Sequence, residues 1–427
     1  MEKQKIIPRE LLPKLEKWLN RREIFAIKGP RQSGKTTLLK LLGERLAGEG
    51  RVVFLNFEDP DTLEAFERDP KGYLRSFISG SERHYFLMDE YHYVRDLGKK
   101  LKLLYDTFEQ AKFIVTGSSS LELGGGMGRF LVGRVFFFEL LPFSFREFLR
   151  ARDERLARIH EQKSGLISDF LAGKGVEVGE DVFVGEFQAL LQEYLIYGGY
   201  PAVVTAEDAE TRRMILKGIY DTYLSRDVVE FLKFTDTLKY RSAVRALAAS
   251  IGGLLNYGEL CSATQSYFKE LKRMISILSE TYILSLVRPF FTNPRTELRK
   301  TPKVYFLDLG LRNYLINNFN PMEARPDSGP MVENFVMLEL MRMFPGEPLN
   351  YWRTIAKAEV DFVIRPEGVP VPVEVKYRRL EKPKVSRSLR SFIESYRPKR
   401  ALVVTRDTWD RVEVGETEVL FAPACYL

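Results

Sequence analysis

A glycine-rich segment near the N-terminus limits the folds that are open to this chain. Residues 29–36 read GPRQSGKT, between the apolar run EIFAI and the helix-forming run TLLKLL. In the pattern GxxxxGKT the glycines allow a tight loop, and the N–H groups of the loop and of the helix N-terminus bind phosphate oxygens. A strand, this loop and a helix in that order predict a nucleotide-binding α/β fold with a parallel sheet.

Individual residues of this loop have distinct expected roles. Lys35 is expected to reach the β- and γ-phosphates, and Thr36 to bind Mg²⁺. The other residues expected to contact ATP are Gly29, Pro30, Arg31, Gln32, Ser33, Gly34 and Thr37.

An acidic pair follows at a suitable separation. HYFLMDEYHYV places Asp89 and Glu90 at the end of an apolar strand, where Asp89 can hold Mg²⁺ and Glu90 can orient and polarise the attacking water. Segments 51–60 and 111–120 supply two further strands, and Thr116 and Ser118 would then face the γ-phosphate. The alternative is an ordinary acidic strand end, but the phosphate loop upstream favours the catalytic interpretation.

Length and composition exclude several classes of protein. A chain of 427 residues exceeds what one core usually supports, so two to four domains are expected. Two cysteines and three histidines are too few for a zinc site, a disulfide framework or a thiol protease. No apolar run reaches the ~18 residues of a membrane span, and the N-terminus lacks signal-peptide features, so a cytoplasmic location is expected. The net charge of +7 permits a polyanionic partner but is weak evidence for one.

These residues together resemble the AAA+ ATPases. The resemblance puts Asn56 in the place of the residue that pairs with the catalytic glutamate, and Ser118 in that of the polar sensor. The match extends to a prokaryotic family of AAA+ ATPases whose members carry a C-terminal domain similar to the PD-(D/E)XK nucleases. The motifs that carry it, in order, are PRQSGKTTLL, LNFEDP, LMDEYHYV, LKLLYD, TGSSSLEL, FLVGR, LLPFSFREFL and YGGYPAVV.

The same resemblance implies an arginine that meets the γ-phosphate. Arg134 in FLVGR, with Arg129 nearby, would do so in a neighbouring subunit, which would make the protein a homo-oligomer. Sequence alone would describe both as surface arginines. Arg226 is a weaker candidate for a second phosphate-sensing arginine, and a helix-surface salt bridge is its alternative.

The middle of the chain is expected to form a lid and a winged helix. Residues 151–236 have a helical pattern and would close over the nucleotide, with the turn at 198–201 near the adenine by family resemblance. Residues 237–320 read as three helices followed by a hairpin. The basic residues expected to contact DNA are Lys269, Lys272 and Arg273 on the third helix and Arg295, Arg299, Lys300 and Lys303 on the wing. A structural spacer is the alternative.

The last region, 326–427, places charges within apolar strands. Asp361 enters one strand of an expected hairpin, and PVPVEVKYRR sets Glu374 and Lys376 on one face of the other. A helical Glu333, then Asp361, then Glu374-x-Lys376 is similar to the PD-(D/E)XK nuclease pattern. This similarity implies Mg²⁺ ligation by Glu333, Asp361 and Glu374, with Lys376 serving the water or the phosphate. The alternatives are a simple Glu/Lys pair and a nuclease-like fold that binds DNA or protein without cleavage.

The combined expectation is a multidomain α/β protein. It comprises a P-loop AAA+ parallel sheet at 1–150, a helical lid at 151–236, a winged helix at 237–320 and a restriction-endonuclease-like domain at 326–427. The expected function is Mg²⁺-dependent ATP hydrolysis that acts on DNA and is coupled to the C-terminal domain. One alternative is a slow ATP-dependent switch whose C-terminal domain only docks. Another is a nuclease whose ATPase domain regulates assembly.

Overall fold

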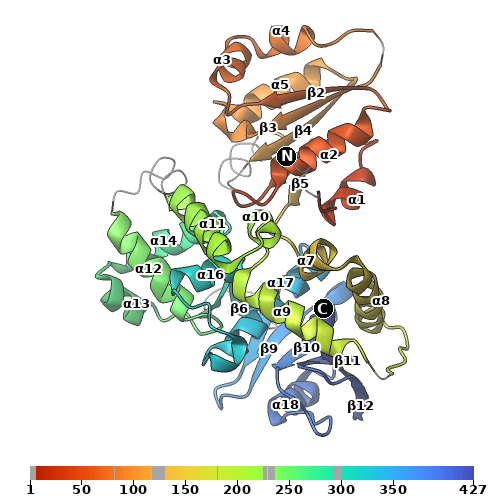
Figure 1. Ribbon diagram of the computed structural model, residues 1–427, viewed down its shortest axis with the longest axis vertical. Helices are drawn as coiled ribbons and strands as arrows, with labels where there is room; N and C mark the ends of the chain where they lie inside the picture. The colour runs from red at the N-terminus through yellow and green to blue at the C-terminus, as the bar shows by residue number, and fades with distance from the viewer. Residues whose placement is uncertain are drawn as a thin grey trace.

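The computed structural model describes residues 6–80, 82–117, 130–179, 181–224, 228, 236–291 and 300–427. It shows an upper α/β lobe built from the N-terminal third of the chain, a lower α/β lobe that contains the C-terminus, and a helical lobe beside it (Figure 1). Among the described residues no helix is both long and apolar enough to cross a membrane.

The upper lobe contains a five-stranded sheet in which all neighbouring strands are parallel, as the sequence predicts. Its order is β2-β3-β4-β1-β5, so β1, which leads into the glycine-rich loop, lies between β4 and the edge strand β5. Apolar residues on the two faces of this sheet form two separate cores. The strands are β1 (Ile24–Lys28), β2 (Arg51–Asn56), β3 (His84–Asp89), β4 (Ala111–Gly117) and β5 (Val135–Glu139). The helices are α1 (Leu11–Glu16), α2 (Lys35–Leu46), α3 (Pro60–Arg68), α4 (Pro70–Arg75), α5 (Leu97–Thr107) and the 3₁₀ turn η1 (Tyr91–Tyr93).

The lower lobe contains a mixed sheet in the order β12-β13-β11-β10-β9-β8-β6-β7. Its strands are β6 (Leu284–Pro289), β7 (Lys303–Phe306), β8 (Asn350–Arg353), β9 (Glu359–Ile364), β10 (Val371–Lys376), β11 (Arg400–Thr405), β12 (Asp410–Val414) and β13 (Thr417–Pro423). Helix α17 (Ser328–Met343) packs on β9 and β10 as part of one core, and α18 (Arg387–Tyr396) belongs to a second core that includes residues of β9, β11 and β13. Short 3₁₀ turns are η4 (Met322–Ala324), η5 (Pro366–Gly368) and η6 (Ala424–Tyr426).

The expected helical lid is not arranged as predicted. Helices α7 (Phe145–Arg152), α8 (Glu154–Leu171) and α9 (Val184–Tyr197) share one core with α17 and the C-terminal sheet. Their apolar faces are therefore buried against the lower lobe and not over the glycine-rich loop (Figure 1). Among the described residues of this region, those that line the pocket beside that loop belong to the short helix α10 (Pro201–Thr205).

The segment predicted to be a winged helix has three helices and an antiparallel hairpin, β6–β7. Its helices are α12 (Thr237–Ala249), α13 (Tyr257–Thr264) and α14 (Phe268–Glu280), and they share a core with α11 (Ala209–Thr222) and α16 (Leu309–Leu315). The hairpin is not independent, because Arg288 and Pro289 of β6 pair in parallel with β8. The expected wing residue Lys303 is 3% exposed, so it does not present a charge to solvent. Arg295 and Arg299 lie outside the described residues.

Candidate functional site

The glycine-rich loop wraps around the start of α2, with Lys35 as the first residue of that helix. Gly34 caps the helix with φ of 93°, a left-handed conformation that favours glycine. A Cβ on Gly29 would lie 2.2 Å from the Leu140 carbonyl oxygen, so a side chain is excluded there. Lys35 Nζ donates to the carbonyls of Gly29 and Pro30 at 3.0 and 2.9 Å. The sequence pattern therefore forms the phosphate loop that its spacing predicts.

Thr36 and Asp89 meet beside this loop. Thr36 Oγ1 donates to Asp89 Oδ2 at 2.6 Å, and the Thr116 hydroxyl donates to Asp89 Oδ1. The three residues come from α2 and the carboxyl ends of β3 and β4, the edge at which ligands bind in parallel α/β sheets. A hydroxyl and a carboxylate this close, next to a phosphate loop, are a donor set that fits Mg²⁺.

Glu90 is held on both its backbone and its side chain. Its φ of 51° is unusual for a residue with a side chain, and its N–H donates to Thr116 Oγ1 at 3.1 Å. Its Oε2 lies 3.0 Å from Nδ1 of His92, a histidine in η1 that is 5% exposed. Burial alone would raise the pKa of Glu90, but the contact with His92 and the positive charges of Lys35 and Arg31 outweigh it and lower this pKa to about 2. Glu90 is therefore ionised near neutral pH.

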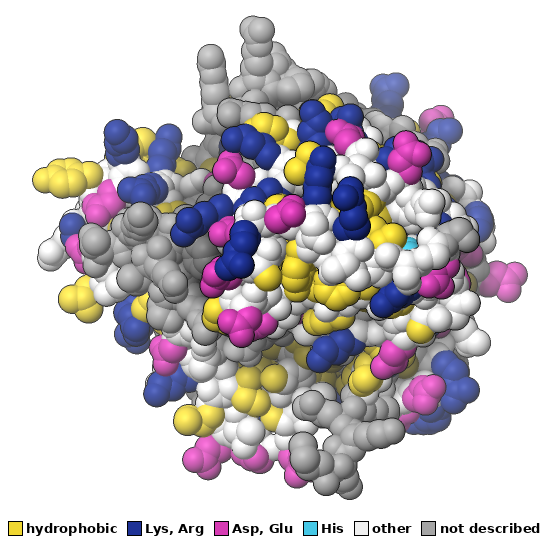
Figure 2. Space-filling view, turned by 90° about the horizontal axis from the view of Figure 1, so that it is seen from above, with side chains coloured by type: hydrophobic (Ala, Val, Ile, Leu, Met, Phe, Trp, Pro, Cys, Tyr) yellow, Lys and Arg dark blue, Asp and Glu magenta, His cyan; other side chains and the backbone are white. Residues whose placement is uncertain are grey.

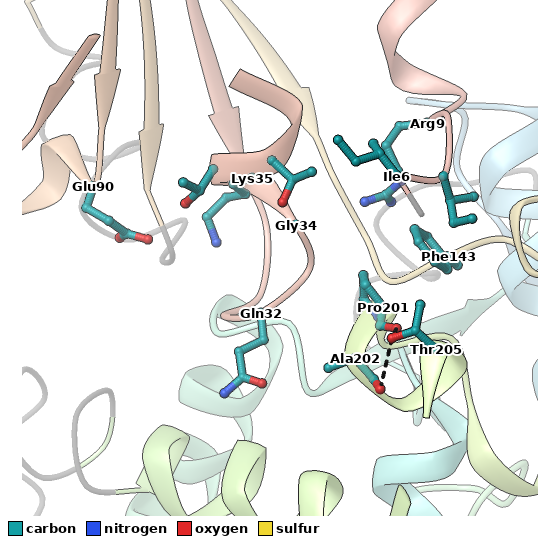
Figure 3. Close-up of a pocket in the computed structure, with 13 residues that line it drawn as sticks. Ile6, Arg9, Gln32, Gly34, Lys35, Glu90, Phe143, Pro201, Ala202 and Thr205 are labelled. Atoms are coloured by element: carbon teal, nitrogen blue, oxygen red, sulfur yellow. Dashed lines mark hydrogen bonds between the residues drawn. The ribbon is translucent and has the colours of Figure 1, made fainter. Parts of the chain in front are cut away.

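A pocket of about 390 Å³ extends from the loop toward α10 (Figure 3). Loop and helix residues line one end together with Glu90, and apolar side chains line the other. Its lining residues are Ile6, Ile7, Arg9, Gln32, Gly34, Lys35, Thr36, Thr37, Glu90, Phe143, Pro201, Ala202 and Thr205. One end thus suits phosphates and the other suits a flat apolar ring, and the turn that the family resemblance associates with adenine lies at the second end.

Arg9 joins the pocket to the rest of the molecule, and no sequence motif indicates it. It is 5% exposed and donates to the carbonyls of Ser33 and Leu141 at 2.6 and 2.7 Å. Its Nε donates to Glu147 at 3.0 Å, and its guanidinium lies 4.8 Å from the centre of the Phe143 ring. One side chain therefore links the phosphate loop, the end of β5 and the start of α7.

Other expected residues lie at different places. Asn56 pairs with Asp89 in the strand register, and its amide oxygen accepts from the Glu58 N–H at 3.1 Å. The Arg134 carbonyl accepts from Ile24, at the start of β1, whereas the phosphate loop follows the end of that strand. Arg134 thus lies at the opposite edge of the sheet from its own loop, 3.3 Å from Asp106. Ser118, Arg129 and Arg226 lie outside the described residues.

In the lower lobe, Glu333 forms an ion pair with the buried side chain of Lys303. Lys303 Nζ lies 2.8 Å from Glu333 Oε1 and 2.7 Å from Glu359 Oε1, and the Tyr305 hydroxyl also donates to Glu333. Burial alone would lower the pKa of Lys303, but Glu333, Asp361 and Glu359 raise it. The ammonium group is therefore a permanent positive charge among these carboxylates.

The other expected metal ligands are engaged separately. Asp361 Oδ2 accepts from the Val375 N–H at 2.7 Å, and burial together with the charge of Glu333 raises its pKa to about 7. Glu374 accepts from Ser386 at 2.7 Å and lies 3.1 Å from Lys376, so the two strand charges pair with each other. Within the described ranges, no three Asp, Glu, His or Cys side chains gather closely enough to hold one metal ion. Metal ligation by Glu333, Asp361 and Glu374 together stays a prediction, and in this structure Lys303 and Lys376 pair with two of the three carboxylates.

Comparison with protein families divides the chain into three segments. The model of an AAA domain matches residues 21–149, so this part of the chain is similar to AAA domains. Two domains of unknown function match further segments, DUF8612 at 188–322 and DUF4143 at 328–425.

Similar proteins occur in bacteria and archaea. An uncharacterized protein of Mycobacterium tuberculosis is 27% identical over 93% of this chain and 79% of its own length. An uncharacterized protein of Haemophilus influenzae is 24% identical over 93% of this chain and 92% of its own. An uncharacterized protein of Methanocaldococcus jannaschii is 23% identical over 85% of this chain and 76% of its own length.

Among solved structures, the chain is similar to the Thermotoga maritima RuvB Holliday junction branch migration motor. That match has a TM-score of 0.28 and 16% identity, and covers 65% of this chain and 89% of the other. AMPPCP-bound DnaA from Aquifex aeolicus matches with a TM-score of 0.29 and 14% identity, and this match covers 64% of this chain and 86% of the other.

Proposed function

We propose that the protein binds and hydrolyses ATP with Mg²⁺. The observation that carries this proposal is the convergence of Thr36, Asp89 and Glu90 beside the phosphate loop of an AAA domain. Thr36 and Asp89 would hold Mg²⁺, which neutralises phosphate charge when bound. The apolar end of the pocket, with Phe143 and Pro201, suits the adenine ring.

The residues of the pocket divide the chemistry between them. Lys35 would exchange its bonds to the loop carbonyls for bonds to phosphate oxygens. Glu90, ionised and next to the phosphate end, would accept a hydrogen bond from the attacking water and polarise it. The hydrogen bond from the Glu90 N–H to Thr116 fixes the backbone position from which this side chain extends.

Steady-state phosphate release tests this proposal. K35A should lose nucleotide binding, measured with a fluorescent ATP analogue, because it removes the phosphate-binding cation. E90Q should retain that binding and lose turnover by about 10² or more, the usual scale for a general base. Wild-type protein without turnover, or E90Q with normal turnover, would contradict the proposal.

We further propose that DNA is the partner and that α14 contacts it. Lys269, Lys272 and Arg273 are exposed on this helix, and Tyr267 and Phe268 before them are 83% and 52% exposed. Basic side chains beside exposed aromatic rings suit both phosphates and bases. On the face shown in Figure 2, by contrast, basic side chains are interspersed with acidic ones.

A charge-reversal variant tests this contact. K269E/K272E/R273E should weaken binding of duplex and forked DNA at least tenfold at moderate salt and flatten its salt dependence, because three phosphate contacts are lost. A matched control, K382E/K384E/R387E, changes three charges around the start of α18. Equal loss in both variants would indicate a general charge effect and not an α14 interface.

The C-terminal domain is proposed to dock a partner without cleaving DNA. Lys303 occupies the space among the carboxylates, and Glu374 is paired with Lys376 and Ser386. We expect no Mg²⁺- or Mn²⁺-dependent DNA cleavage by the wild type. Cleavage that is abolished in E374A would instead establish a nuclease.

Arg134 is proposed to act on the nucleotide of a second copy. Its position at the far edge of its own sheet, roughly 16 Å along the five residues of β1, keeps it from its own loop. Mixing inactive E90Q with inactive R134A should restore part of the turnover if the site is shared. No restoration would contradict a trans role.

A further inference from the structure

His92 lies against the Glu90 carboxylate, which is proposed to polarise the attacking water. Its Nδ1 is 3.0 Å from Glu90 Oε2, and its side chain is 1% exposed. Its ring lies 4.4 Å from the Tyr93 ring, centre to centre, and η1 holds it directly after β3. A ring buried this completely has little rotational freedom, so it fixes the atom that it contacts.

The backbone of Glu90 makes such support necessary. Glu90 has a left-handed backbone conformation, so its side chain does not take the direction that the regular alternation of a strand would give it. The Thr116 hydroxyl fixes only the N–H of Glu90. The carboxylate itself needs a separate partner to hold one orientation toward the phosphate end of the pocket.

The family resemblance would assign this task to Asn56, but the contacts differ. Asn56 is exposed, and its amide oxygen accepts from the Glu58 N–H at 3.1 Å, which caps the turn after β2. Nδ1 of His92 lies 3.0 Å from Oε2 of Glu90, although the two atoms are not aligned as a hydrogen bond in this structure. The three-dimensional arrangement thus places His92, and not Asn56, beside the Glu90 carboxylate.

We propose that His92 is the positioning residue for Glu90 in ATP hydrolysis, and that its Nδ1, which is within reach of the carboxylate but not aligned with it in this structure, donates a hydrogen bond to that carboxylate when ATP is bound. It does not line the pocket, and acts by holding the base in one orientation. This inference rests on the proposed ATPase function. It predicts a loss in kcat without a change in nucleotide affinity, because His92 does not line the pocket.

Two variants of His92 separate hydrogen bonding from packing. H92L removes the donor while filling similar space, and kcat should fall about tenfold or more with KM and the Kd for the ATP analogue unchanged. H92N places an amide N–H near the position of Nδ1 and should recover most of the lost kcat. The matched control is H84N, since His84 is also buried but lies at the opposite end of β3, bonded to Glu82 and Ser79.

A measurement without nucleotide tests the contact directly. The chain has only three histidines, so ¹⁵N-histidine labelling gives few ring signals, and the loss of one set in H92N assigns His92. The expected result is a protonated Nδ1 in the wild type whose signal shifts in E90A. An Nδ1 signal that E90A leaves unchanged would overturn the inference.

The outcomes distinguish the inference from the function beneath it. Absence of wild-type turnover would refute the ATPase proposal, and the ring signals would still report on the contact. Wild-type turnover that H92L leaves intact would overturn the role of His92 alone. Turnover lost equally in H92L and H92N would show a packing role and overturn the hydrogen-bond role.

Discussion

At the scale of single residues, buried charges hold the nucleotide pocket together. Arg9 and Glu147 are each 5% exposed in their side chains, and Glu147 also accepts from the N–H groups of Glu10 and Ser144. Removing one partner of such a pair leaves the other charge buried and is strongly destabilising. Surface pairs such as Arg45–Glu16 contribute little by comparison.

We predict that R9M destabilises the protein and weakens ATP binding together. The free energy of unfolding should fall by about 3 kcal/mol, because Glu147 loses its cation and the Ser33 carbonyl loses a donor. Urea unfolding and the Kd for the ATP analogue are the measurements. The control R45M should change the unfolding free energy by less than about 1 kcal/mol. Similar losses in the two variants would contradict the role of burial.

At the scale of elements, Asp308 ties the turn before α10 to the start of α16. Its carboxylate accepts from the Gly199 N–H and the Leu311 N–H, both at 2.8 Å. Burial raises its pKa to about 6, and the hydrogen bonds oppose this only in part. Asp327, before α17, shows the reverse, since hydrogen bonds from Arg325 and Arg312 outweigh burial and lower its pKa to about 2.

The sign of the pH effect at Asp308 follows from these shifts. A carboxyl whose pKa is raised on folding stabilises the folded protein when the pH is below the pKa that the carboxyl has in the unfolded chain. This stabilisation is lost as the pH rises toward about 6, the pKa of Asp308 in the folded protein. Relative to D308N, the unfolding free energy of the wild type should therefore decline by about 2–3 kcal/mol between pH 4 and pH 7. Denaturant unfolding over this range measures the difference. For the control D327N, the difference in unfolding free energy from the wild type should change only at pH values below 4, because the pKa of Asp327 is lowered. If the curves of the wild type and D308N ran parallel between pH 4 and pH 7, the assignment to Asp308 would be refuted.

At the scale of the whole molecule, α17 connects the nucleotide pocket to the C-terminal sheet. At its C-terminal end, Arg342 donates to the carbonyls of Pro142 and Phe143 at 3.2 and 3.4 Å and pairs with Glu339 at 2.5 Å. Phe143 lines the pocket, and its N–H donates to Gly199 at 2.7 Å. At its N-terminal end, Asp327 binds Arg312 of α16. Both ends of the helix thus contact segments that lead to the pocket.

We predict that R342M uncouples the two lobes. Hydrogen exchange of β9 and β10 should change when wild-type protein binds a non-hydrolysable ATP analogue, and this change should be reduced in R342M at saturating nucleotide. Arg390, exposed on α18, offers the control R390M. A response in R342M equal to that of the wild type would exclude this route.

Local patterns predict much of the nucleotide site. GxxxxGKT and the acidic pair after an apolar strand are contiguous, and strand order alone brings their ends to one edge of a parallel sheet. The hairpin carrying Asp361 and Glu374 is likewise a local feature, and β9 and β10 form it as predicted.

Contacts between distant segments could not be read from these patterns. Helical periodicity identifies an apolar face but not what covers it, so α8 and α9 were expected over the nucleotide and instead pack on the C-terminal sheet. Lys303 was expected in solvent because charge alone does not reveal the carboxylates that surround it. Arg9 and His92 belong to no spacing rule, since their partners are set by how the chain returns on itself. Short-range periodicity and loop chemistry thus specify the phosphate loop, whereas long-range packing specifies which side chains support it.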